Sequence, residues 1–328
     1  MTKGGNKIFS SAVRRWLLRL LGVAVLLGFS YHVYRLTATL DWSEFSRALS
    51  RPERWKYLVL AVLLMPVNWL LEAKKWHLLL QGFLPWSFLK TFKATIAGVT
   101  VSAATPNRVG EIGGRMTLAT KEEWPAVVTS SILGSACQWI AFLILAWPGL
   151  IWTAGPLVQA KIGISVMYLW PVGPVVLVVG FVLGKGVLLG IAKYLNGRWG
   201  LDNTNLIIAL RQVKAGLIVH AGCYACLRFS VYCMQLYLLL RFFGLALPLV
   251  KTLAGIAGIY LVQAGIPLPP GVNLALRSEL GIQLWGGSAE AAAATVLAFA
   301  TLFIVNVLLP ALPGYWAVAQ TTHDADTD

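Results

Sequence analysis

Long apolar segments follow one another along most of this chain and limit its fold more than any other feature. After an uncleaved first span that ends near Leu36, we expect spans at about 57–80, 126–151, 164–193, 217–241 and 291–312. Each is near the roughly 20 residues that a helix needs to cross a bilayer. Because lipid offers no hydrogen bonds to a backbone, these segments predict an all-α, polytopic helical membrane protein with about six to eight spans.

Composition excludes the soluble classes. Hydrophobic residues make up 58% of the chain and charged residues only 12%, about half the share of an ordinary soluble domain. The net charge of +14 does not indicate a nucleic-acid partner, because no basic segment carries a nucleic-acid-binding motif. The cations instead lie between the apolar spans, where they bind anionic headgroups and keep loops in the cytoplasm.

The distribution of these cations predicts a cytoplasmic N-terminus, and one region disagrees with it. Four cations fall where this orientation places the chain outside, in the company of Asp41, Glu44 and Glu53: Arg47, Arg51, Arg54 and Lys56.

Two stretches of the sequence read as copies of one another. Lys90-Thr91, Pro106 and Gly110 recur as Lys251-Thr252, Pro267 and Gly271, always 161 residues later (251 − 90, 267 − 106 and 271 − 110). In each copy an apolar run is interrupted by the proline and the glycine, which we interpret as hinges. Such an interruption at membrane depth is typical of a transporter binding site.

The two interrupted regions, 87–120 and 249–284, therefore predict broken or re-entrant helical hairpins, with two full helices as the alternative for either. Two crossings separate the halves, about 57–151 and 217–312, so they traverse the bilayer in opposite directions as an inverted repeat. We expect a single integral membrane domain over 1–314 and a short cytoplasmic tail over 315–328.

The first interruption carries the most informative polar motif. Arg108, Glu111 and Arg115 are spaced to share one face of a helix that starts at Pro106. A single charge at membrane depth costs at least ~2.5–3.5 kcal/mol, so the three imply mutual pairing and access to water or an anionic group. We expect Glu111 to orient one arginine and the other to bind phosphate. The alternative is a cytoplasmic loop with solvated charges.

Other charges inside or beside the spans complete the candidate site. Arg228 lies mid-span and serves either function or structural pairing, while Arg277 and Glu279 offer a second anionic contact or a structural loop pair. Glu72 and Lys75 form either a buried pair beside the first site or the cytoplasmic end of a span. The substrate-binding candidates are thus Arg108, Glu111, Arg115, Arg228, Arg277, Glu279, Glu72 and Lys75. Gln138, Gln263 and Asn306 are assigned to helix packing.

The sequence contains no recognisable catalytic constellation. It has no cluster with metal-ligand spacing, no nucleophile elbow, no paired aspartates and no phosphate loop. We therefore expect no enzyme activity, no catalytic or metal-binding residue and no cofactor.

The chain resembles the flippase-like transmembrane region of lysylphosphatidylglycerol synthases. The resemblance lies in Trp76 with the leucines after it, in the segment from Pro106 to Glu111 with Arg115, and in the segment from Pro267 to Glu279. It implies that the protein moves an anionic phospholipid or polyprenyl-linked lipid between the leaflets of the bacterial cytoplasmic membrane. No synthase domain follows residue 314, so lysyl transfer is not expected.

Two other functions stay open. One is an accessory membrane protein that binds a polyprenyl-phosphate carrier and scaffolds a glycosyltransferase, with that enzyme or a second copy of the chain as its partner. The other is an integral membrane enzyme acting on lipid headgroups, which the missing catalytic constellation disfavours.

Overall fold

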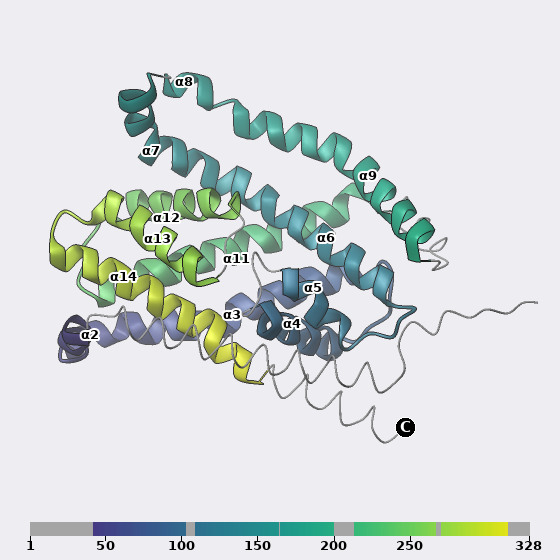
Figure 1. Ribbon diagram of the computed structural model, residues 1–328. Helices are drawn as coiled ribbons and strands as arrows, with labels where there is room; N and C mark the ends of the chain where they lie inside the picture. The colour runs from purple at the N-terminus through teal and green to yellow at the C-terminus, as the bar shows by residue number, and fades with distance from the viewer. Residues whose placement is uncertain (1–41, 103–108, 164, 200–212, 267–269, 314–328) are drawn as a thin grey trace, which may run out of the picture.

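The computed structural model describes residues 42–102, 109–163, 165–199, 213–266 and 270–313, and these form helices and turns without a strand (Figure 1). In chain order the elements are α2 (Trp42–Leu49), η1 (Pro52–Arg54), α3 (Trp55–Leu80), α4 (Phe88–Ser102), α5 (Val109–Met116), α6 (Trp124–Ala141), η3 (Phe142–Ala146), α7 (Trp147–Ile162), α8 (Val166–Leu169), α9 (Val172–Trp199), α11 (Ala215–Phe242), α12 (Leu249–Ala264), α13 (Pro270–Trp285), α14 (Ala289–Phe303) and η4 (Ile304–Leu308).

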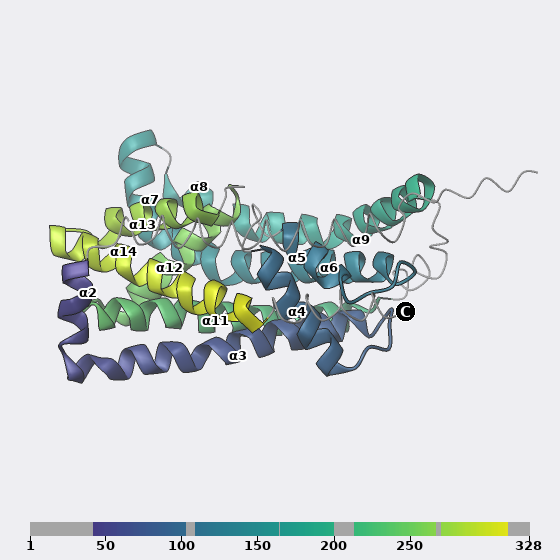
Figure 2. The ribbon, with the colours of Figure 1, turned by 60° about the horizontal axis from the view of Figure 1, so that its bottom comes forward.

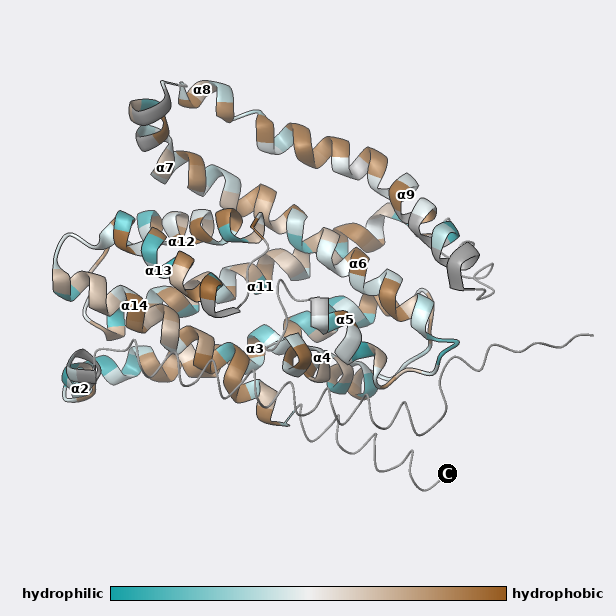
Figure 3. Ribbon diagram, in the orientation of Figure 1, coloured by the Kyte–Doolittle hydropathy of each residue, from teal (hydrophilic) through white to brown (hydrophobic). Residues whose placement is uncertain are grey.

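Five helical segments within the described residues are long and apolar enough to cross a membrane: Pro52–Leu80, Trp124–Pro156, Val166–Gly184, Ala215–Phe242 and Ala289–Pro313. They coincide with the five spans predicted after the first, and they define a multi-pass, all-helical membrane protein. The first predicted span and the predicted tail lie outside the described residues. Figure 3 shows that hydrophobic residues make up most of these helices.

Helices α3 and α11 lie side by side along the length of the molecule (Figure 2). They are antiparallel, because contacts that advance along α3 retreat along α11. Tyr57 meets Arg241, the carbonyl oxygen of Ala61 accepts from Gln235 at 2.9 Å, and Glu72 pairs with Arg228. The site described below is built around this pair of helices.

Two pairs of shorter helices, α4–α5 and α12–α13, lie toward opposite ends of the molecule (Figures 1 and 2). Their starting residues are separated by the same offset as the sequence repeat, since 249 − 88 and 270 − 109 both equal 161. The predicted hinges Pro106 and Pro267 fall outside the described residues. Gly110 and Gly271 lie in the first turns of α5 and α13, so they belong to the helices and not to the breaks.

Two long helices contain a π-helical turn at corresponding places. Phe142–Ala146 follows α6 and Ile304–Leu308 follows α14, with first residues 162 positions apart (304 − 142). A π turn holds one extra residue and often marks a functional site. After the π turn Phe142–Ala146, the chain continues as helix α7 to Ile162, and Pro156 lies inside this helix.

Candidate functional site

A cavity of about 420 Å³ lies between the two pairs of short helices. Its wall takes residues from α4 and α5 on one side and from α12 and α13 on the other, with α3, α6 and α11 between them. The charged residues that line it are Glu72, Lys75, Glu111, Arg115, Arg228 and Arg277. Four cations thus face two carboxylates.

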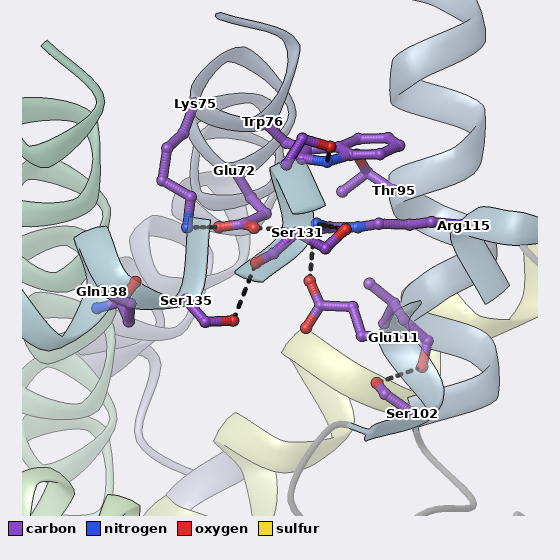
Figure 4. A network of polar contacts seen from close by, with 12 residues as sticks. Glu72, Lys75, Trp76, Thr95, Ser102, Glu111, Arg115, Ser131, Ser135 and Gln138 are labelled. Atoms are coloured by element: carbon purple, nitrogen blue, oxygen red, sulfur yellow. Dashed lines mark hydrogen bonds and ion pairs between the residues drawn. The ribbon is translucent and has the colours of Figure 1, made fainter. Parts of the chain in front are cut away.

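Glu72 is the centre of this cluster. One carboxylate oxygen lies 2.9 Å from Nη2 of Arg115, and the other lies 2.7 Å from Nζ of Lys75 and 3.2 Å from Nη1 of Arg228. Figure 4 shows Glu72 between Lys75 and Arg115. All four residues are at most 5% exposed, so each charge requires the others as partners in place of water.

Arg115 is fixed on several sides. Glu111, one turn earlier on α5, accepts a hydrogen bond from Nη2, and the Ser131 hydroxyl accepts one from Nη1 at 3.2 Å. The guanidinium also lies 4.4 Å from the centre of the Trp76 ring, a cation–π geometry. Trp76 is itself held by a hydrogen bond from Nε1 to the Ser130 hydroxyl at 3.0 Å. These contacts hold Arg115 in place as part of the cavity wall (Figure 4).

Two glycines allow α5 to approach α4 closely enough to place these groups. A Cβ on Gly114 would lie 2.5 Å from the carbonyl oxygen of Ala97 and 2.6 Å from Cα of Gly98. A Cβ on Gly98 would lie 2.8 Å from the carbonyl oxygen of Glu111. The two backbones are therefore in direct contact, which sets where Glu111 and Arg115 enter the cavity.

On the other side of the cavity Arg277 has neutral partners. Its Nε donates to Oε1 of Gln263 at 3.0 Å, its Nη2 donates to the same oxygen, and its guanidinium lies 4.9 Å from the centre of the Tyr260 ring. No carboxylate among the described residues lies within ion-pair distance of Arg277. Its positive charge is thus oriented, but these residues do not neutralise it.

The structure gathers six of the eight predicted binding residues around one cavity: Glu72, Lys75, Glu111, Arg115, Arg228 and Arg277. Glu279 is not among them, since it is exposed and accepts a hydrogen bond from Gln283 at 2.9 Å. Arg108 lies outside the described residues. Glu72 and Lys75 are buried, as the first of the two predicted alternatives requires, and do not form a solvated end of a span.

Some cavity residues were not identified from the sequence. Gln138 and Gln263, assigned to packing, accept hydrogen bonds from Arg228 and Arg277 and line the cavity. Ser131 and Ser135 had no prediction. Positions 131, 135 and 138 are spaced by four and three, so they share one face of α6, and this polar stripe in an apolar span was the available signal.

Sequence comparison agrees with the architecture. No curated protein matches the chain. Residues 16–314 match the family described as "Lysylphosphatidylglycerol synthase TM region". The matched range includes every described helix, so this multi-pass membrane protein belongs to the family of lysylphosphatidylglycerol synthase transmembrane regions.

Proposed function

We propose that the protein is a flippase-like lipid translocase that binds an anionic headgroup, from a phospholipid or a polyprenyl-phosphate lipid, in the cavity between the two short-helix pairs. The observation that carries this proposal is the charge of the cavity wall. Four cations and two carboxylates give a net charge of +2 inside a membrane protein. An uncompensated cation at that depth is costly, and an anionic ligand offsets the cost.

The arrangement divides the cations into two kinds. Glu72 neutralises Lys75, Arg115 and Arg228 only in part, and together they form one ion-paired cluster in the wall. Arg277 has no carboxylate partner among the described residues and presents a planar guanidinium, the group best suited to bidentate contact with phosphate. We therefore assign the main phosphate contact to Arg277, with Arg228, Glu111 and Arg115 as further charged residues of the cavity wall.

Translocation requires access from both leaflets, and the inverted repeat that we infer supplies it. Three observations support this relation: α3 and α11 are antiparallel, the short-helix pairs start 161 residues apart, and the π turns recur 162 residues apart. A side-chain hydrogen bond recurs too: the hydroxyl of Thr91 donates to the carbonyl oxygen of Ser87, and the hydroxyl of Thr252 donates to that of Pro248. Two pseudo-equivalent halves allow one site to open toward either side of the membrane in turn.

Family membership and the cation distribution support a place in the bacterial cytoplasmic membrane with the N-terminus in the cytoplasm. The cavity wall holds no constellation for group transfer among its described residues, and the proposed activity moves a lipid without changing it covalently.

The direct test is leaflet exchange of a labelled anionic lipid in liposomes that contain the purified protein. Arg277→Gln removes the charge and keeps a polar side chain, and we expect exchange to fall about 10-fold or more, the effect of losing a charge-assisted hydrogen bond. Lys251→Gln is the control, because Lys251 is exposed and does not line the cavity. Equal exchange by the Arg277 variant and the control would contradict the assignment.

The same preparation separates translocation from scaffolding. Lipid that co-purifies with the wild-type protein and is not exchanged between leaflets would contradict translocation. That outcome would favour an accessory protein that holds a lipid carrier for a glycosyltransferase.

A further inference from the structure

A second basic cleft lies at the opposite end of α3 from Lys75, where α3 begins and α11 ends. It has a volume of about 330 Å³ and is lined by Glu53, Arg54, Lys56, Tyr57, Arg241, Gly244, Leu245 and Ala246. Tyr57 and Glu72 are 15 residues apart on one helix, so the cleft lies about 22 Å along α3 from the central cluster. The two sites share no lining residue.

The cations of this cleft converge on one phenol ring. Nη2 of Arg241 donates to the Tyr57 hydroxyl at 3.3 Å, and its guanidinium carbon lies 5.4 Å from the ring centre. Nζ of Lys56 lies 5.3 Å from the same centre. Arg54 completes the group from η1, with its guanidinium against the backbone of Gly244.

Gly244 makes room for that guanidinium. Its φ of +102° lies in the region that favours glycine, and a Cβ at this position would lie 2.5 Å from Nη1 of Arg54. The turn after α11 therefore has the conformation and the missing side chain that bring Arg54 toward Arg241.

Positive charge in the cleft exceeds the negative charge that the described residues place beside it. Glu53 is the single carboxylate in the lining, against three cations, and no ion pair joins Arg54, Lys56 or Arg241 to a carboxylate among the described residues. Like charges held close together repel, and a bound anion removes that repulsion. The convergence indicates an anionic ligand.

The basic character of this cleft is not repeated in the other half of the chain. With the offset of 161, the counterparts of Lys56, Tyr57, Gly244 and Leu245 in the other half are Leu217, Ile218, Phe83 and Leu84. All four counterparts are apolar and pack against the hydrophobic core. In one half of the chain these positions are thus filled by apolar side chains. In the other half the equivalent positions form the basic cleft.

We propose that this cleft binds a phosphate group, and that the phosphate belongs to the headgroup of an anionic phospholipid. It lies where two spanning helices end, beside Trp55, an exposed tryptophan of the kind that anchors helices at the headgroup layer. Guanidinium groups and a phenol hydroxyl are suitable donors to phosphate oxygens. The site gives a role to Arg54 and Lys56, two of the four cations that disagree with the charge rule for membrane orientation. It does not depend on the proposed translocase activity.

The test is a lipid titration of the purified full-length protein in neutral detergent, with the thermal unfolding midpoint as readout. Phosphatidylglycerol is the probe, phosphatidylcholine the zwitterionic comparison, and inorganic phosphate at matched ionic strength the free-anion arm. We expect phosphatidylglycerol to raise the midpoint and Arg54→Gln/Arg241→Gln to weaken its apparent affinity about 20- to 30-fold, from ~1 kcal/mol for each cation. A midpoint that phosphate alone raises equally would assign the cleft to the free anion and overturn the lipid assignment.

The control variant is Arg51→Gln, an exposed cation at the same end of α3 that does not line the cleft. Equal weakening by Arg51→Gln would show general surface attraction and overturn the site. If the double variant does not fold, Lys56→Gln replaces it, because Lys56 is exposed and its loss leaves both guanidiniums in place. It is expected to weaken phosphatidylglycerol about fivefold, and an unchanged affinity would overturn the proposal.

Discussion

At the residue scale, the central cavity depends on one carboxylate that serves three cations. Glu72 contacts Lys75 three residues later on the same helix, Arg115 on α5 and Arg228 on α11. Burying a charge is tolerated only when it is paired, and here a single side chain provides that pairing for three elements. Glu72 therefore joins α3 to both halves of the cavity wall as well as compensating charge.

Replacing Glu72 by Gln should destabilise the protein strongly. The side chain keeps its size but leaves three buried cations with less compensation, a change that costs about 3–5 kcal/mol when a buried pair is broken. The measurement is the unfolding midpoint in detergent. Glu279→Gln, an exposed carboxylate, is the control and should change stability by less than about 0.5 kcal/mol. Equal midpoints for the two variants would rule out the role given to Glu72.

At the element scale, the position of α5 is set by backbone contact with α4. Gly114 and Gly98 lie where the two helices touch, whereas a Cβ added to Gly113, the preceding residue of α5, would meet no atom of a neighbouring element within 4 Å. Gly113 and Gly114 are thus adjacent in one helix, but only Gly113 has space for the methyl group of an alanine.

Gly114→Ala and Gly113→Ala form a matched pair. The first should force α5 away from α4, cost about 1–3 kcal/mol and displace Arg115, which reduces leaflet exchange. The second should leave exchange unchanged and raise stability slightly, because alanine is favoured over glycine in a helix by roughly 0.5–1 kcal/mol. Unfolding midpoints and exchange rates of both variants check this, and a harmless Gly114→Ala would refute the contact.

The elements also show what could be predicted from the sequence. Apolar runs predicted the five described spans, because the length and hydropathy of a span depend on local sequence. The hinge prediction was less accurate for the glycines, since Gly110 and Gly271 lie inside helices. The contact between Glu72 and Arg115 could not be predicted, since it joins residues 43 positions apart through the packing of α3, α5 and α6. From local spacing, the partner of Arg277 could be either Glu279 or an anionic ligand. In the structure its hydrogen-bond partner is Gln263, which precedes it by 14 residues on another helix.

At the scale of the whole molecule, the two halves of the repeat that we propose differ in chemistry. With the offset of 161, the counterparts of Glu72, Arg115 and Arg277 are Cys233, Leu276 and Met116, none of them charged. The charged wall is therefore built once, at the place where the halves meet, and is not duplicated. A single site with two related frameworks around it is what alternating access requires.

This arrangement predicts which side of the membrane reaches the cavity. In a chain whose four cysteines, Cys137, Cys223, Cys226 and Cys233, are replaced by Ala, Ser135→Cys should react with an impermeant thiol reagent in both right-side-out and inside-out vesicles. Ser135 lines the cavity with an exposed side chain, so in the inverted repeat that we propose each opening uncovers it in turn. Lys251→Cys, exposed outside the cavity, should react in one vesicle type only. Reaction of Ser135→Cys from one side alone would mean that the cavity has one mouth, as a carrier-binding scaffold needs and a translocase does not.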